Sequence, residues 1–132
     1  MSARSAAANG RLLVEAHTPM AELWRHVVLQ LLDDYQSQVR RLGVAAASTI
    51  FDEEPPRTGD TRVDAALAAL AEHLARRDGW RVPTWARDPD RRTLDWWFVD
   101  DLPALQAFAL RESPLAFRKR GVFIGDGGLL RV

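Results

Sequence analysis

Histidines are the first residues to consider for chemistry, because imidazole binds metal ions and transfers protons near neutral pH. The chain has three of them, His17, His26 and His73. A helical metal site usually places two ligands on one face, for example four residues apart, and each histidine stands alone on its predicted element. Glu22 lies four residues before His26, and Glu72 adjoins His73 but points to another helix face. We therefore interpret all three as surface or boundary residues and predict no metal site.

Acidic residues form four small groups along the chain. A catalytic carboxylate pair needs one acid kept protonated by burial or by a like charge, with both acids facing one cleft. These groups fall instead on a polar helix face, in a loop, in a turn and at a helix start, where solvation and capping account for them. The groups are Asp33-Asp34, Asp52-Glu53-Glu54, Asp88 with Asp90, and Asp100-Asp101.

Nucleophilic and phosphate-binding motifs give no better candidate. There is no cysteine and no Gly-x-Ser-x-Gly sequence, and Ser113 before Pro114 is explained as a helix cap. The glycine-rich run at 125–128 lacks the Gly-Lys-Ser/Thr that completes a phosphate-binding loop. We expect a protein that is not an enzyme and has no cofactor.

Tryptophan is the most unusual component. Trp96 and Trp97 are adjacent and cannot both face inward on one regular element, so we expect one of them, with Phe98, at the surface or over an irregular seam. An exposed tryptophan is a common anchor for a partner. The alternative is that all five tryptophans fill joints of a small core. The five are Trp24, Trp80, Trp85, Trp96 and Trp97.

The triplet Arg118-Lys119-Arg120, with Arg111 one or two helical turns earlier, makes the clearest basic patch. Phe117 and Phe123 lie beside it, a mixture that suits phosphate and base contacts or an acidic protein surface. Cations at the C-terminal end of a short helix also interact favourably with the helix dipole, which is the structural alternative.

Composition indicates an ordinary globular protein. The 132 residues are 47% hydrophobic and 27% charged, and 18 basic residues balance 18 acidic ones. No global field therefore draws the chain to nucleic acid or to an anionic membrane. No apolar run is long enough to span a bilayer, and the first residues do not resemble a secretion signal, so we expect a cytoplasmic protein.

The N-terminal half predicts an arm followed by helices. Residues 1–17 are expected to be a flexible arm, and residues 18–132 a single helical domain. Thr18 as cap and Pro19 as first helical residue begin an amphipathic helix at 19–42, which Gly43 ends. Its apolar face packs within the chain or against a second copy. Residues 44–51 are either a helical turn or an apolar connector.

The second half predicts shorter elements. The proline-bearing segment 52–59 is a loop, and a helix capped by Asp60 or Thr61, with Asp64 completing a weak capping box, runs to Gly79. Residues 80–93 are irregular, a helix capped by Asp100 or Asp101 runs to Ser113, and a short helix follows to Arg120. Residues 122–124 are extended. The fold class is a small all-α domain of four or five helices, with at most one short extended segment near the C-terminus.

Several motifs between residues 53 and 132 resemble a family of uncharacterised actinobacterial proteins. They are Glu53-Glu54-Pro55-Pro56-x-Thr58-Gly59-Asp60, the helix around Leu67–Ala75, Pro83-x-Trp85, Trp97-Phe98 and Ser113-Pro114-x-Ala116-Phe117-Arg118-x-Arg120-Gly121-x-Phe123-Ile124. In that family the region often follows a helix-turn-helix domain of a transcriptional regulator. The resemblance implies an antitoxin-like protein that binds a separately encoded toxin, such as a nucleotidyltransferase, and implies no catalytic residue.

Two functions follow from these observations. The first is a non-catalytic protein-interaction domain, antitoxin-like, whose partner-binding surface comprises Trp96, Trp97, Phe117, Arg118 and Arg120. The second is a nucleic-acid-binding regulatory protein that uses Arg111, Arg118, Lys119 and Arg120. A homo-oligomer formed through the helix at 19–42 is compatible with either.

Overall fold

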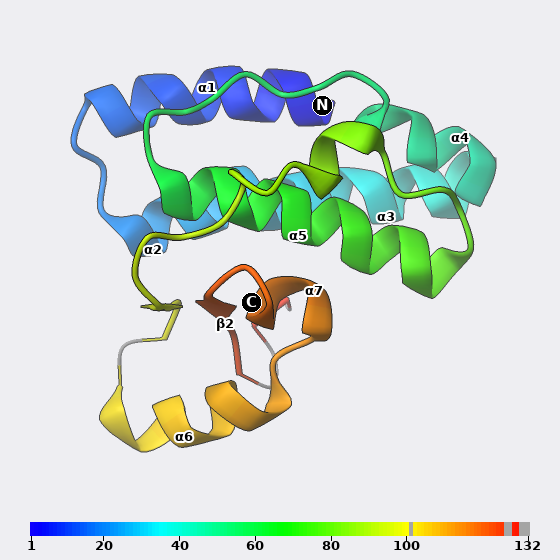
Figure 1. The fold of residues 1–132 in the computed structure, drawn as a ribbon. Helices are drawn as coiled ribbons and strands as arrows, with labels where there is room; N and C mark the ends of the chain where they lie inside the picture. Colours follow the sequence, from blue (N-terminus) through cyan, green and yellow to red (C-terminus); the bar gives the residue numbers. More distant parts are fainter. Residues whose placement is uncertain (101, 126–127, 130–132) are drawn as a thin grey trace.

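The computed structural model describes residues 1–100, 102–125 and 128–129, which form a mostly helical domain with one two-stranded sheet (Figure 1). The predicted small helical fold is confirmed. Helix α5 (Thr61–Asp78) lies at the centre and contacts α1 (Ala3–Glu15), η1 (Trp24–Leu29), η3 (Thr84–Arg87) and α7 (Leu115–Arg118). It is buried around most of its circumference, as expected of a core helix rich in alanine and leucine.

The N-terminal segment is a packed helix, so the expectation of a flexible arm at 1–17 is wrong for residues 3–15. Ser2 caps α1, and its side chain accepts a hydrogen bond from Ser5 N. Small residues at steps of three and four, from Ala3 to Gly10, bury one face. A Cβ at Gly10 would lie 3.2 Å from Val27, so the absence of a side chain allows this close approach. The buried face of α1 consists of alanine and glycine, which hydropathy scales score as only weakly apolar. The apolar pattern of the sequence therefore did not reveal it.

The long helix predicted at 19–42 forms as α2 (Met20–Leu23), η1 and α3 (Gln30–Leu42), in which η1 is a π-helical segment. Pro19 occupies the cap position, so α2 begins one residue later than predicted, and Thr18 supplies no cap. Gly43 ends α3 with φ +91°. The apolar face, from Leu23 to Tyr35, is buried within this chain. It is therefore not available to a second copy, which corrects the proposed oligomer contact.

Residues 44–51 are helical and comprise α4 (Val44–Ser48) and the 3₁₀ turn η2 (Thr49–Phe51), which decides the alternative left open. The loop at 52–59 and the start of α5 agree with prediction, since Asp60 Oδ1 accepts from Arg62 N at 2.8 Å. Gly79 ends α5 in the left-handed conformation, φ +83°. Asp64 does not complete a capping box; it is buried and accepts from the backbone N and side-chain Oγ1 of Thr58.

The described part of the C-terminal third contains two strands, one more than predicted. β1 (Trp97–Phe98) pairs in parallel with β2 (Val122–Phe123), and α6 (Pro103–Glu112) and α7 lie between them in sequence. Gly121 introduces β2 with φ +80°. Figure 1 shows α6 on the opposite side of β2 from α5. Asp101, a predicted cap, and part of the predicted turn at 125–128 fall outside the described residues.

Candidate functional site

The predicted aromatic surface is largely a core cluster. Trp97 is only 8% exposed and Phe117 is 0% exposed. Both rings make edge contacts with the ring of Trp24, at centroid distances of 5.7 and 6.1 Å. Trp96 is 66% exposed and touches Phe123 by its edge. One member of the adjacent pair thus faces inward, as predicted, but the assignment of Trp97 and Phe117 to a partner-binding surface is wrong.

The assignment of Arg120 to a binding surface is also wrong. Its side chain is only 7% exposed and contacts residues of three elements. Nη1 donates to the carbonyl of Ala116 in α7 at 2.7 Å, and Nη2 donates to the carbonyl of Ala86 in η3 at 2.6 Å. Nη1 also lies 2.7 Å from Oε1 of Glu72 in α5. Arg120 is therefore a structural cross-link and is not available to bind a protein or a nucleic acid.

Glu72 is the centre of this buried charge cluster. Its side chain is 4% exposed, and Arg76 Nε and Lys119 Nζ each lie 2.7 Å from one of its oxygens. Burial alone would raise the pKa of Glu72, but hydrogen bonds from Lys119, Arg76 and Arg120 outweigh it and lower the pKa from 4.5 to about 2. The sequence argument missed this residue. The available signal was an acid inside the alanine- and leucine-rich stretch of α5.

The remaining predicted cations lie at the surface. Arg111 and Arg118 are exposed. Arg118 Nη1 donates to the carbonyl of Arg111 at 3.2 Å, and the guanidinium of Arg111 lies over the ring of Phe108. The predicted nucleic-acid patch therefore consists of Arg111 and Arg118, because Lys119 and Arg120 are bound to Glu72.

Beside Glu72 lies a cavity of about 370 Å³, the cationic pocket, where α5, η3, the turn after η3 and the end of α7 meet. One of its residues, Arg91, is buried and lies over the Trp85 ring. Nη2 of Arg91 donates to the carbonyl of Pro55, and burial lowers the pKa of this guanidinium. The pocket is lined by Glu72, Arg76, Arg87, Asp88, Pro89, Arg91, Arg92, Lys119 and Arg120.

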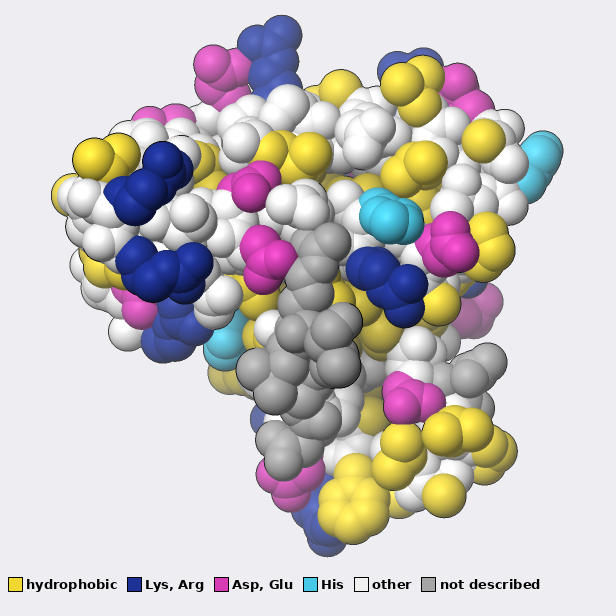
Figure 2. Space-filling model, turned by 180° about the vertical axis from the view of Figure 1, so that it is seen from behind, with side chains coloured by type: hydrophobic (Ala, Val, Ile, Leu, Met, Phe, Trp, Pro, Cys, Tyr) yellow, Lys and Arg dark blue, Asp and Glu magenta, His cyan; other side chains and the backbone are white. Residues whose placement is uncertain are grey.

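Exposed apolar side chains gather on and beside α6, and we call them the α6 surface. Between 39% and 64% of each of these side chains is exposed. Figure 2 shows hydrophobic side chains at this end of the molecule. A cavity of about 340 Å³ between α6 and the end of β2 includes two of them, Leu105 and Phe108. The α6 surface comprises Leu102, Leu105, Phe108, Leu110 and Leu115.

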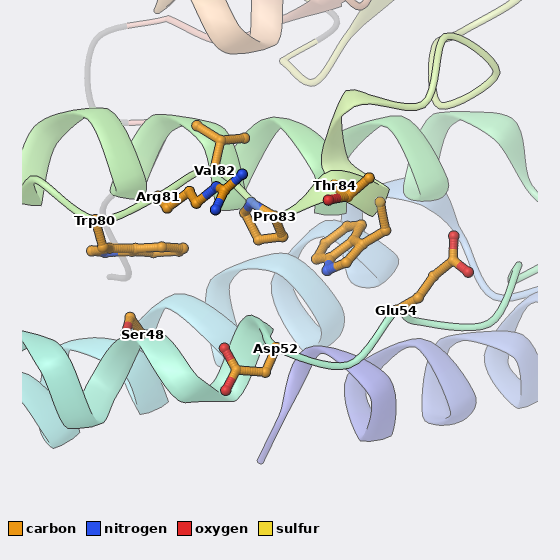
Figure 3. Close-up of a pocket in the computed structure, with 9 residues that line it drawn as sticks. Ser48, Asp52, Glu54, Trp80, Arg81, Val82, Pro83 and Thr84 are labelled. Carbon is orange, nitrogen blue, oxygen red and sulfur yellow. The ribbon is translucent and has the colours of Figure 1, made fainter.

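A further cavity, of about 770 Å³, is a groove between α4–η2 and the segment leading into η3 (Figure 3). Trp80 and Trp85 form part of its wall. Their indole N–H groups are already used, by Tyr35 Oη at 2.8 Å and by the carbonyl of Phe51 at 2.9 Å. Both rings are thus held by the fold, and their donors do not serve a ligand.

The histidines lie apart from one another. His17 and His26 are exposed, while His73 is half-buried and makes an edge contact with Phe117 at 6.0 Å. Burial, and secondarily the charge of Arg77, lowers the pKa of His73. Within residues 1–100, 102–125 and 128–129, no three acidic or histidine side chains are grouped so as to hold a metal ion.

None of the helices in the described part of the chain is both long and apolar enough to span a bilayer. No protein-family model, no curated protein and no solved structure matches the chain.

Proposed function

We propose that this chain is a non-catalytic protein-interaction domain that binds its partner through the α6 surface. The observation that carries the proposal is the exposure of five large apolar side chains on and beside one helix. Contiguous apolar patches are uncommon on monomeric proteins and mark interaction sites when they occur. Scattered exposed residues, such as Leu12 on α1, do not have this meaning.

The position of α6 supports this assignment. The helix packs mainly against β2 and lies apart from the α5 core (Figure 1). Leu105 and Phe108 are one helical turn apart, so both side chains lie on the edge of the 340 Å³ cavity. An apolar side chain of a partner that fills this cavity would remove both from water, at about 25 cal/mol for each Å² buried.

The partner in this proposal is a separately encoded cytoplasmic protein. In the antitoxin-like role that we propose for this chain, that partner is a toxin. That role rests on the resemblance of residues 53–132 to the actinobacterial family. We do not propose nucleic-acid binding as a second function, because Lys119 and Arg120 are ion-paired with Glu72. Arg111 and Arg118 alone could neutralise few phosphate groups, so they would contribute little affinity for nucleic acid.

A photo-crosslinking experiment tests the proposal. The photoreactive residue p-benzoylphenylalanine replaces Phe108 in the native host, and the tagged chain is purified after irradiation. We expect one crosslinked protein at defined stoichiometry. The double substitution Leu105→Asp and Phe108→Asp should abolish co-purification of that protein from untreated cells, because two buried charges would enter an apolar interface.

Leu12→Asp provides the matched control, since Leu12 is an exposed leucine, at 65%, on a different helix, α1. Co-purification should persist in this variant. Recovery of the wild-type chain without any partner, or equal loss of the partner in the Leu12→Asp control, would contradict the proposal.

A further inference from the structure

The cationic pocket has more positive charge than its own acids compensate. Six of its lining residues are basic, and two, Glu72 and Asp88, are acidic. The cations come from α5, η3, the turn after η3 and the end of α7, segments that are far apart in sequence. The formal net charge of the whole chain is zero, so the excess of positive charge in this cavity is a local feature.

Both acids of the pocket are already occupied. Glu72 Oε2 accepts from Arg76 Nε at 2.7 Å and from Lys119 Nζ at 2.8 Å, and Arg120 Nη1 lies 2.7 Å from Oε1, so one negative charge faces three positive ones. Asp88 Oδ2 binds Arg57 Nη2 at 2.8 Å, and its other oxygen accepts from the backbone N of Asp90. Neither carboxylate has capacity to neutralise the other arginines of the pocket.

Two exposed arginines of the pocket, Arg87 and Arg92, have no hydrogen-bond or ion-pair partner among the described residues. Arg91 adds a buried charge. Its Nε and Nη1 atoms have no hydrogen-bond partner in the described part of the chain, and the nearest carboxylate, Glu54, is 3.9 Å from Nη2. A buried guanidinium with two unpaired N–H groups is unfavourable unless a negative charge compensates it nearby.

A second cavity, of about 380 Å³, continues from the first, because both are lined by Arg92, Lys119 and Arg120. It adds Arg118 and the exposed ring of Trp96. That ring makes a T-shaped contact with the Phe123 ring, at a centroid distance of 5.1 Å, and 66% of Trp96 remains exposed. An exposed aromatic face beside a cluster of arginines combines a stacking platform with a phosphate site.

We propose that the cationic pocket binds the phosphate group of a mononucleotide, with the base stacked on Trp96. Arg87 and Arg92 donate hydrogen bonds to the phosphate oxygens, and Arg76 and Lys119 add charge from positions fixed by Glu72. Planar guanidinium groups suit this role because each offers paired donors to two oxygens of one phosphate. The proposal is independent of partner binding at the α6 surface.

Isothermal titration calorimetry of the whole chain at constant ionic strength tests the proposal, with adenosine monophosphate, inorganic phosphate and adenosine as probes. We expect adenosine monophosphate to bind more tightly than phosphate, and adenosine alone to give no measurable binding. Arg87→Ala with Arg92→Ala should weaken both phosphate-bearing probes by at least about tenfold, because charge-assisted hydrogen bonds are lost. Trp96→Ala should weaken adenosine monophosphate and leave phosphate unchanged.

Arg40→Ala with Arg41→Ala is the matched control, since both are exposed arginines on α3 that do not line the cationic pocket. This variant should bind all probes like the wild type. An equal loss of affinity for the phosphate-bearing probes in the control variant would show a general effect of charge and would overturn the proposed site. Absence of binding by both phosphate-bearing probes at millimolar concentration would also overturn it. Binding of a short oligothymidylate, but not of adenosine monophosphate, would replace the proposed ligand with single-stranded nucleic acid.

Discussion

Arg120 Nη1 lies 2.7 Å from Oε1 of Glu72, and this contact ties the end of α7 to the middle of α5 below the surface. The pair comes from positions far apart in sequence, one inside an apolar helix and the other in a basic triplet. Lys119 and Arg76 complete the surroundings of the same carboxylate. The charge cluster therefore joins the C-terminal third to the core, and its loss should be measurable as a loss of stability.

The first prediction concerns Glu72 and acid. The pKa of Glu72 is about 2 in the folded chain and near 4.5 in the unfolded chain, so the unfolded state takes up the proton first as pH falls. Its stabilisation is fully present above about pH 4.5 and is lost as pH falls toward 2. A shift of this size is worth about 3 kcal/mol. Glu72→Gln should lower the free energy of unfolding by a similar amount at pH 7 and flatten the acid dependence.

Urea unfolding between pH 7 and pH 3 measures this effect. Glu53→Gln is the control, because Glu53 is exposed and pairs with Arg4, which is also exposed. Its unfolding free energy should follow the wild-type curve. A Glu72→Gln variant that retains the wild-type acid dependence would show that the cluster does not contribute as described.

The second prediction separates two arginines two positions apart. Arg120→Ala removes two hydrogen bonds to carbonyl groups and one partner of buried Glu72, and should cost about 3 kcal/mol of unfolding free energy. Arg118→Ala affects an exposed side chain with one long hydrogen bond and should change stability by less than about 0.5 kcal/mol. Chemical denaturation of both variants is the measurement. Similar effects would contradict the structural role of Arg120.

The third prediction separates the adjacent tryptophans. Trp97→Ala removes the ring that packs against Trp24 and should cost about 3 to 5 kcal/mol. Trp96→Ala should cost less than about 1 kcal/mol, since 66% of Trp96 is exposed. Thermal unfolding followed by circular dichroism compares the two. A larger loss for Trp96 than for Trp97 would reverse the assignment.

The sequence allowed prediction of elements whose signals are local. The caps at Asp60 and Gly79 mark both ends of α5, and the proline-bearing loop before it was equally clear. The apolar period of 19–42 predicted a helix and its buried face. The inserted π turn at Trp24–Leu29 was not predicted, because it changes the register without removing any apolar residue.

The candidate site was predicted less well because its character depends on contacts between distant residues. Arg118, Lys119 and Arg120 are similar in sequence, yet one is exposed, one is half-exposed on Glu72 and one is buried. Glu72 decides this difference, and it lies 47 residues from Lys119. The exposure of α6 depends on the absence of a covering element among the described residues, which the apolar pattern of one helix does not reveal.

Both ends of α6 are attached to the β2 strand and the residue after it. Val99 N donates to the carbonyl of Phe123 at 3.0 Å, and Ser113 Oγ accepts from Ile124 N at 2.8 Å. Because α6 packs mainly against β2 and little against the core, we expect this helix to open locally without disturbing α5. Local unfolding of α6 is then less costly than global unfolding. Partner binding at this helix can be coupled to its ordering, so affinity would depend on helix propensity as well as on contact area.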